Sequence, residues 1–310
     1  MDDRVEIFVM SLANQFKGKF PEIFSQNVKL SNYSWFNLGG EAEFFFKPRD
    51  INQLIEILTE AKKINMKTII LGAGSNTLIR DNGVKGIVIK LGSNFSFTKL
   101  IDKNIIEAGA ATLDKKVANF AKDNNLTNLE FLSCIPGSIG GAIIMNSGCY
   151  ENDISNILHS IQVIDKNDLC PKEIKKKDIK FLYRGSNLSE DLIITSAKFK
   201  GTLDKKDKIE KKQSLLINRK KLSQPSQIKT CGSTFKNISK DKKAWMLIKE
   251  AGCDEFREGD AVISKKHCNF FVNNGTAKSI DIENLIKRVK KKVHYITGVN
   301  LELEIKIIGE

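Results

Sequence analysis

Two glycine-rich segments of this 310-residue chain have the composition of phosphate-binding loops. The first is Gly72-Ala73-Gly74-Ser75-Asn76, after a short apolar run, and the second is Pro136-Gly137-Ser138-Ile139-Gly140-Gly141, between aliphatic residues. Glycine lacks a Cβ and tolerates positive φ, so backbone N–H groups can converge on an anion. Two such loops fit a ligand with two phosphates. Each loop taken alone is also compatible with a tight turn or a glycine-mediated helix start.

The first loop departs from the dinucleotide-binding fingerprint. That fingerprint, G-x-G-x-x-G, requires a third glycine where this chain has Thr77, and it must open a helix of several turns. Here residues 76–83 lead directly to a turn and another strand, and no acidic residue ends that strand. We therefore expect a phosphate-binding loop outside a Rossmann fold.

Three further residues have side chains suited to anion binding or proton transfer, but their local patterns favour structural roles. Arg184 alone would be a surface ion-pair partner, and Ser233 alone would be a turn residue. Glu304 lies in the alternating segment 301–307, whose pattern would place its acidic residues on the solvent face. Residue pattern by itself assigns no chemistry to these three.

Hydrophobic periodicity predicts the elements that would position the loops. Helices are expected at 5–16, 51–64 with Asp50 as N-cap, 113–124, 202–222, 244–251 and 281–295. Strands are expected at 68–71, 86–91, 104–109, 161–165, 192–200 and 301–307, with a strand–turn–strand unit at 33–48. This order favours an α+β fold over a regular βαβ array. The Lys-rich helix resembles a connector, so we place the main domain boundary there.

The charge balance and the cysteines limit the possible partners. A net charge of +13 favours anionic partners, but only seven of the 50 basic residues are arginine. We therefore expect no nucleic-acid partner. The six cysteines contain no C-x-x-C pair and the three histidines are dispersed, so no metal site is predicted. No signal-type or membrane-spanning apolar run is present, which predicts a cytoplasmic protein with no membrane partner.

A series of motifs extends between residues 33 and 309. They include Phe36-Asn37-Leu38-Gly39-Gly40, Leu71-Gly72-Ala73-Gly74-Ser75-Asn76, Ile135-Pro136-Gly137-Ser138-Ile139-Gly140-Gly141, Tyr183-Arg184-Gly185-Ser186, Cys231-Gly232-Ser233-Thr234-Phe235-Lys236-Asn237 and His267-Cys268-Asn269-Phe270-Phe271. In order and spacing, these motifs resemble those of the UDP-N-acetylenolpyruvoylglucosamine reductases, the MurB family.

The resemblance implies a fold and a reaction. The fold would be a two-lobed FAD-binding domain of the vanillyl-alcohol-oxidase (PCMH) type at 31–202, after an N-terminal helical extension at 1–30. A C-terminal α+β substrate-binding domain at 203–310 would contribute its last strand to the active site. The resemblance implies non-covalent FAD, NADPH as hydride donor, and reduction of a UDP-sugar enolpyruvyl ether to UDP-N-acetylmuramate in peptidoglycan precursor synthesis. We expect a monomer.

The resemblance also implies roles for individual residues. The family's catalytic arginine, serine proton donor and glutamate fall on Arg184, Ser233 and Glu304. Substrate contacts fall on Lys221 and Asn237. The FAD contacts fall on Gly72, Ala73, Gly74, Ser75 and Asn76 in the first loop and on Pro136, Gly137, Ser138, Gly140 and Gly141 in the second.

Three positions depart from the family pattern: Cys134, Cys149 and Ile238 replace the residues usual there. The span from Tyr183 to Leu222 has no tyrosine after Tyr183, which indicates the subtype without a substrate-clamping tyrosine loop. Two other functions stay open at this stage. One is an FAD oxidase of the same fold that reacts with oxygen, and the other is a basic RNA- or membrane-binding protein.

Overall fold

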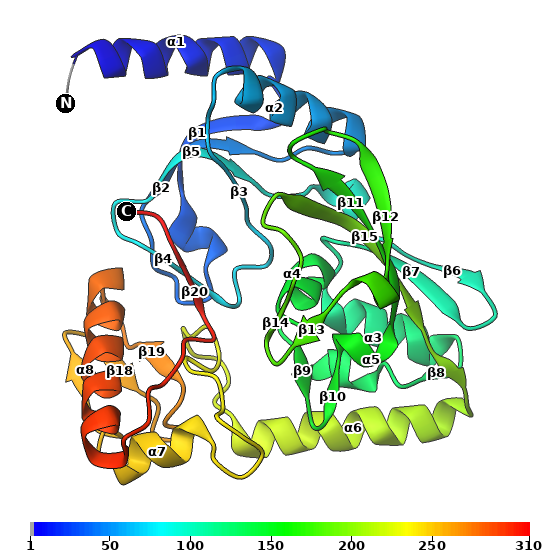
Figure 1. Ribbon diagram of the computed structural model, residues 1–310, viewed down its shortest axis with the longest axis vertical. Coiled ribbons are helices and arrows are strands. Elements are labelled where there is room, and N and C mark those ends of the chain that lie inside the picture. The colour runs from blue at the N-terminus through cyan, green and yellow to red at the C-terminus, as the bar shows by residue number, and fades with distance from the viewer. Residues whose placement is uncertain (1–2) are drawn as a thin grey trace.

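The computed structural model describes residues 3–310, which form two lobes and a C-terminal unit (Figure 1). The first lobe contains a four-stranded sheet with the order β1 (Phe24–Lys29), β2 (Glu41–Phe46), β5 (Val84–Ile89), β3 (Thr68–Ile70). β1 pairs antiparallel with β2, whereas the other neighbours are parallel. The helices α1 (Asp3–Lys19) and α2 (Ile51–Lys63) pack against this sheet through one apolar cluster.

The predicted cap of α2 explains where that helix begins. The Asp50 side chain accepts a hydrogen bond from the Gln53 N–H at 3.0 Å, as expected of an N-cap residue. In α1, Phe16 is fully buried, and its ring lies edge-on to the rings of Phe44 and Phe46 on β2. The contacts of Phe16 hold α1 on the sheet, and the apolar cluster that includes Leu54 and Ile57 holds α2 there.

The second lobe is built on a five-stranded antiparallel sheet with the order β12 (Pro171–Lys175), β11 (Leu158–Asp165), β15 (Leu192–Lys200), β7 (Ile105–Gly109), β6 (Thr98–Asp102). Its helices are α3 (Asp114–Asp123), α4 (Ile139–Ile144) and α5 (Ile154–Ile157). Short paired strands complete it: β9 (Gly148–Cys149) with β10 (Asn152–Asp153), β13 (Phe181–Leu182) with β14 (Gly185–Ser186), and β8 (Leu126–Thr127) with β16 (Thr202–Leu203). The second glycine loop leads into α4.

The long helix α6 (Lys206–Ser223) connects the second lobe to the C-terminal unit (Figure 1). Its side chains bond to the second lobe: Gln213 Nε2 donates to Asn119 Oδ1 at 2.8 Å, and Lys220 Nζ donates to the Cys134 carbonyl at 2.7 Å. The helix therefore rests on the second lobe over much of its length.

The C-terminal unit contains α7 (Ala244–Glu250), α8 (Ser279–Thr297) and a sheet of β17 (Arg257–Glu258), β18 (Ala261–Ile263) and β19 (Phe271–Asn273). The apolar face of α8, which includes Ile282, Leu285 and Val289, is buried against this sheet and α7. The chain then returns to the first lobe, where β20 (Lys306–Ile308) pairs parallel with β4 (Thr77–Ile79). In Figure 1 this return is the red segment between the C-terminal unit and the first lobe.

The predicted α+β class is confirmed, but two elements were predicted wrongly. Residues 30–33 form a 3-10 turn, and the partner of β2 is the earlier β1, because the predicted unit at 33–48 contains only one strand. The segment 301–307 is mostly irregular, with β20 starting at Lys306. The boundaries after residues 30 and 202 stay predictions. None of the helices within residues 3–310 combines the length and apolarity needed to cross a bilayer.

Candidate active site

Arg184 and Glu304 meet where the second lobe faces the C-terminal segment. Arg184 Nε donates to Glu304 Oε1 at 3.0 Å, and each side chain is 18% exposed. Two terminal nitrogens of Arg184 also donate to backbone carbonyls, to Asn146 O at 3.4 Å and to Gly148 O at 2.8 Å. A guanidinium has five N–H donors, so one N–H on each terminal nitrogen remains for a ligand. The Arg184 side chain is therefore fixed by three hydrogen bonds and still has two N–H groups available for a ligand.

A two-residue turn between β13 and β14 presents Arg184. Leu182 pairs with Gly185, which leaves Tyr183 and Arg184 as the turn. Arg184 has a φ of 55°, in the left-handed region that non-glycine residues seldom occupy. Such strain costs about 1–3 kcal/mol and persists where the surroundings fix it. Here the ion pair and the two carbonyl contacts fix it.

Glu304 lies on the segment that precedes β20, and its backbone is held on both sides. Its N–H donates to the Thr234 carbonyl at 2.8 Å, and its carbonyl accepts from Asn76 Nδ2 at 3.0 Å. Burial raises the pKa of the Glu304 carboxyl, against the opposing effect of the Arg184 and Lys236 charges. The solvent-face placement that the alternating pattern suggested is therefore wrong.

Ser233 lies in a segment that contacts both Glu304 and the first glycine loop. One residue after Ser233, Thr234 accepts the hydrogen bond from Glu304, and Phe235 pairs with Leu303 in an isolated bridge. Before Ser233, the Cys231 thiol donates to the carbonyl of Gly74 at 3.5 Å. The structure thus brings the predicted serine segment, the predicted glutamate and the first loop together.

The first glycine loop has backbone amides that are free to bind a ligand. Within residues 3–310, none of the N–H groups of residues 72–76 donates a hydrogen bond to a protein group. The loop carbonyls, in contrast, are bonded: Lys90 Nζ donates to Gly72 O at 2.6 Å, and Trp35 N–H donates to Gly74 O at 3.0 Å. Five free amides and a nearby ammonium group are suited to a phosphate.

The second loop lies against the first. A Cβ on Gly72 would come within 3.1 Å of Ser138 Oγ, so the two loops approach closely at that glycine. In the described chain the N–H groups of Gly137, Ser138 and Gly141 also lack a protein acceptor. The Gly140 N–H is bonded to Ala110 O at 2.9 Å, so this predicted contact is not a free donor. The two loops therefore form one surface lined with amides, and this surface fits a dinucleotide pyrophosphate.

Asp114, a carboxyl beside these loops, was not predicted from the sequence. Asp114 is fully buried at the start of α3, and both of its oxygens lack a hydrogen-bond partner among the described residues. A Cβ on Gly137 would lie 2.8 Å from Asp114 Oδ2, so the carboxyl faces the second loop directly. Burial raises the pKa of Asp114 well above its usual range.

Of the two predicted substrate contacts, Asn237 contacts the turn that carries Arg184, and Lys221 lies near the end of α6, one residue after Lys220. Asn237 Nδ2 donates to the Tyr183 hydroxyl at 3.2 Å, which connects the C-terminal unit to the turn that carries Arg184. The Lys221 side chain is exposed, and its carbonyl accepts from Lys266 Nζ at 2.6 Å. The preceding Lys220 is partly buried, and this burial lowers the pKa of its ammonium group. Lys220 was not predicted, because a Lys-rich helix gives no signal for which lysine faces inward.

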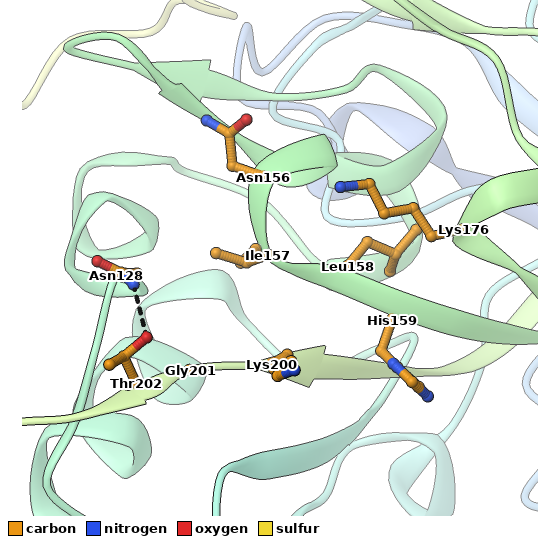
Figure 2. Close-up of a pocket in the computed structure, with 9 residues that line it drawn as sticks. All are labelled: Asn128, Asn156, Ile157, Leu158, His159, Lys176, Lys200, Gly201 and Thr202. Atoms are coloured by element: carbon orange, nitrogen blue, oxygen red, sulfur yellow. Dashed lines mark hydrogen bonds between the residues drawn. The ribbon is translucent and has the colours of Figure 1, made fainter.

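A separate hollow of about 380 Å³ lies on the second lobe (Figure 2). Its lining residues are Asn128, Asn156, Ile157, Leu158, His159, Lys176, Lys200, Gly201 and Thr202. It includes none of the predicted site residues, and its polar side chains are exposed. The candidate active site is therefore the region around Arg184 and not this hollow.

Comparisons with known proteins identify the family and the fold. The family model described as the C-terminal domain of UDP-N-acetylenolpyruvoylglucosamine reductase matches residues 224–308, and an FAD binding domain model matches residues 42–168. The chain is 45% identical to the UDP-N-acetylenolpyruvoylglucosamine reductase of Pelagibacter ubique, over 97% of this chain and 98% of that protein. It is 42% identical to that of Orientia tsutsugamushi, over 93% and 95% of the two chains. The crystal structure of the Thermus caldophilus reductase superposes with a TM-score of 0.80 at 30% identity, over 92% of this chain and 98% of that one.

Proposed function

The chain belongs to the UDP-N-acetylenolpyruvoylglucosamine reductase family, and from this premise we propose that Arg184, Ser233 and Glu304 perform its chemistry. It is an FAD-dependent oxidoreductase that reduces a UDP-sugar enolpyruvyl ether with NADPH in peptidoglycan precursor synthesis. The observation that carries the residue assignment is the 3.0 Å contact between Arg184 and Glu304, beside the serine segment and the first loop.

The amide-lined loops hold the cofactor in this proposal. The free N–H groups of residues 72–76, with those of Gly137, Ser138 and Gly141, bind the pyrophosphate of FAD. Pro136 and Gly140 shape the second loop, since neither has a free N–H to donate. When bound, FAD supplies the hydride that is added to the substrate double bond.

Arg184 stabilises the charge that develops on the substrate. As the terminal vinyl carbon accepts a hydride, negative charge spreads over the adjacent carbon and the carboxylate. The two free N–H groups of the Arg184 guanidinium can bind that carboxylate as a planar fork. Because the donors are held in place before the reaction, they stabilise the transition state without reorganisation.

Ser233 and Glu304 complete the reduction. Ser233 delivers a proton to the α-carbon from its hydroxyl. Serine is a weak acid, so a nearby positive charge must assist it, and Lys236 is the candidate in the same segment. Lys236 lowers the raised pKa of Glu304 and is 3.5 Å from Glu302 Oε2, which places its charge near the site. A neutral Glu304 donates a hydrogen bond to the enolic oxygens, in keeping with the raised pKa of this carboxyl.

Asn237 and Lys221 bind the rest of the UDP-sugar in this proposal, and Lys220 adds a third polar contact. Asn237 is already oriented by two bonds, since its Oδ1 accepts from the Ala244 N–H at 3.1 Å and its Nδ2 donates to Tyr183. The two lysines at the end of α6 supply the positive charge that a diphosphate needs. The protein works as a monomer in the cytoplasm, with its domains divided after residues 30 and 202.

A flavin absorption experiment tests the function. The purified protein should show flavin bands that bleach with NADPH under anaerobic conditions and recover when the enolpyruvyl UDP-sugar is added. If the flavin bands recover when air is added but do not recover when the UDP-sugar is added, the protein is an oxidase of the same fold instead. Light scattering of the same sample tests the monomer, because a mass of twice 34.8 kDa would contradict it.

A further inference from the structure

Two cysteines that the reaction does not use meet at the wall of the active site. Cys134 ends the 3-10 helix η3 (Glu130–Cys134), and Cys149 lies in β9. The Cys149 thiol donates to the Phe131 carbonyl of the same 3-10 helix at 3.4 Å. Phe131 and Cys134 are three residues apart, which is one turn of a 3-10 helix, so this contact places the Cys149 thiol beside Cys134. The Cys149 side chain therefore joins β9 to η3, the 3-10 helix that carries Cys134.

Both cysteines are next to groups that hold the active-site cations. Gly148, the neighbour of Cys149, offers its carbonyl to Arg184 Nη2 at 2.8 Å. The carbonyl of Cys134 accepts from Lys220 Nζ at 2.7 Å. A change in the distance between the two cysteines would therefore move the backbone that positions Arg184 and Lys220.

The environment of this pair favours a reactive thiolate. The neighbouring Cys149 thiol lowers the pKa of Cys134 to about 7, and the Lys220 charge acts in the same direction against burial. Two other cysteines differ, because burial raises the pKa of Cys231 to about 12 and that of Cys253 to about 11. Cys149 is also partly exposed, which gives a small oxidant access to the pair.

We propose that Cys134 and Cys149 are a peroxide-sensitive dithiol whose oxidation to a disulfide slows reduction of the UDP-sugar. The thiolate attacks one oxygen of hydrogen peroxide, the O–O bond breaks, and the leaving hydroxide takes a proton to become water. The sulfenic acid so formed is attacked by the second thiol, the S–O bond breaks, and a second water leaves. Two thiols and one peroxide thus give one disulfide and two waters.

The effect on catalysis rests on the proposed role of Arg184. To bond with Cys134, the Cys149 sulfur gives up its hydrogen bond to Phe131 and pulls β9 toward η3. The Gly148 carbonyl moves with β9, so Arg184 loses its shortest backbone contact. Loss of one hydrogen bond to a charged group corresponds to a rate decrease of about tenfold or more. NADPH reduction of the flavin does not involve these residues and should be unchanged.

The sequence makes the disulfide directly measurable. Trypsin cleaves after Lys122 and Lys166, so one peptide holds Cys134 and Cys149 and no other cysteine. The holoenzyme is treated with graded hydrogen peroxide, and remaining thiols are alkylated. Formation of the disulfide lowers the mass of this peptide by two hydrogens and prevents its alkylation. Cyanogen bromide then cleaves at Met145, and two fragments that stay together until dithiothreitol is added identify a true disulfide.

We expect this peptide to oxidise in parallel with an approximately tenfold loss in the rate of flavin reoxidation by the sugar, reversed by dithiothreitol. Cys149→Ala should abolish both effects of peroxide, whereas Cys170→Ser, which alters an exposed cysteine, should preserve them. Peroxide doses that oxidise Cys170 but leave the 134–149 peptide alkylated would overturn the proposal, as would a disulfide that leaves the rate unchanged. If untreated enzyme never responds to the sugar, the proposed function fails, while a disulfide found by mass still supports the modification site.

Discussion

Arg184 and Glu304 are 120 positions apart in the sequence, yet their side chains form an ion pair with a 3.0 Å separation. Each arrives from a different part of the fold, one from the turn between β13 and β14 and the other from the segment before β20. The pair joins the second lobe to the chain that returns from the C-terminal unit. Both the position of the guanidinium and the raised pKa of the Glu304 carboxyl therefore depend on how these two parts dock.

Arg184→Lys should slow reoxidation of reduced flavin by the UDP-sugar by about 100- to 1,000-fold. Lysine keeps the charge but loses the fork and the two carbonyl contacts of Arg184. Stopped-flow absorbance measures this step apart from flavin reduction by NADPH, which should be unaffected. Arg49→Lys, at an exposed ion pair with Glu22, is the matched control. Equal reoxidation rates in both variants would refute the role of Arg184.

Ser233→Ala should leave hydride transfer from NADPH intact and lower the rate of reoxidation by about two to four orders of magnitude. The substitution removes the hydroxyl and leaves the backbone pairing of Ser233 with Phe270 in place. Ser96→Ala, at an exposed serine, should behave as wild type. An unchanged reoxidation rate would show that another group delivers the proton.

Glu304→Gln should remove the alkaline limb of the pH–rate profile for reoxidation. Burial raises the pKa of Glu304, so the neutral, donating form is present below that pKa and is lost as pH rises through it. A glutamine side chain donates at every pH. The reoxidation rate of Glu304→Gln should therefore stay constant over the pH range in which the wild-type rate falls. Glu302→Gln, at a carboxyl that is 76% exposed, is the control and should retain the limb.

Asp114→Asn should reduce the dependence of stability on pH. Burial raises the folded-state pKa of Asp114 above its unfolded value, so the folded protein binds more protons between the two values. The free energy of unfolding therefore falls as pH rises from the unfolded pKa through the folded pKa. Asparagine cannot ionise, so urea unfolding at saturating FAD should show a smaller fall and higher stability at alkaline pH. Asp178→Asn, at an exposed residue, should leave the slope unchanged.

Gly74→Ala should abolish tight FAD binding or unfold the first lobe. Gly74 has a φ of 68°, and a Cβ there would lie 1.8 Å from the carbonyl oxygen of Tyr33, an overlap that backbone must relieve. Gly18→Ala is the control, since Gly18 is in α1 with open space around it and alanine favours helix by up to about 1 kcal/mol. Flavin fluorescence titration separates weaker binding from unfolding, which circular dichroism detects. Wild-type affinity in Gly74→Ala would contradict the role of this loop.

The elements with strong local signals were predictable. The apolar face of α8 and the Asp50 N-cap of α2 each depend on residues that are close together in the sequence. Both appear in the structure as expected. The amides of the first loop are also a local property, because the glycine spacing itself permits their exposure. The N-terminal strand β1 escaped detection because its buried face depends on α1 and β2, which cover only part of it.

The three-dimensional site could not be derived from periodicity. The alternating pattern of residues 301–307 predicted that Glu304 faces solvent. In the structure Arg184, from the second lobe, covers the Glu304 side chain. A local pattern carries no information about a contact with such a distant segment. Likewise, nothing local distinguishes Lys220 from its lysine neighbours or places Cys134 near Cys149. These placements depend on docking between distant segments, and only the resemblance to a known family assigned roles to Arg184, Ser233 and Glu304.

The pairing of β20 with β4 has a consequence for biosynthesis. A ribosome completes both lobes, and thus the amide-lined loops, long before it reaches Glu304. Glu304 reaches the site only when residues 306–308, close behind it in the sequence, align beside β4. The proposed site is therefore complete only after β20, the last strand of the described chain, has paired with β4.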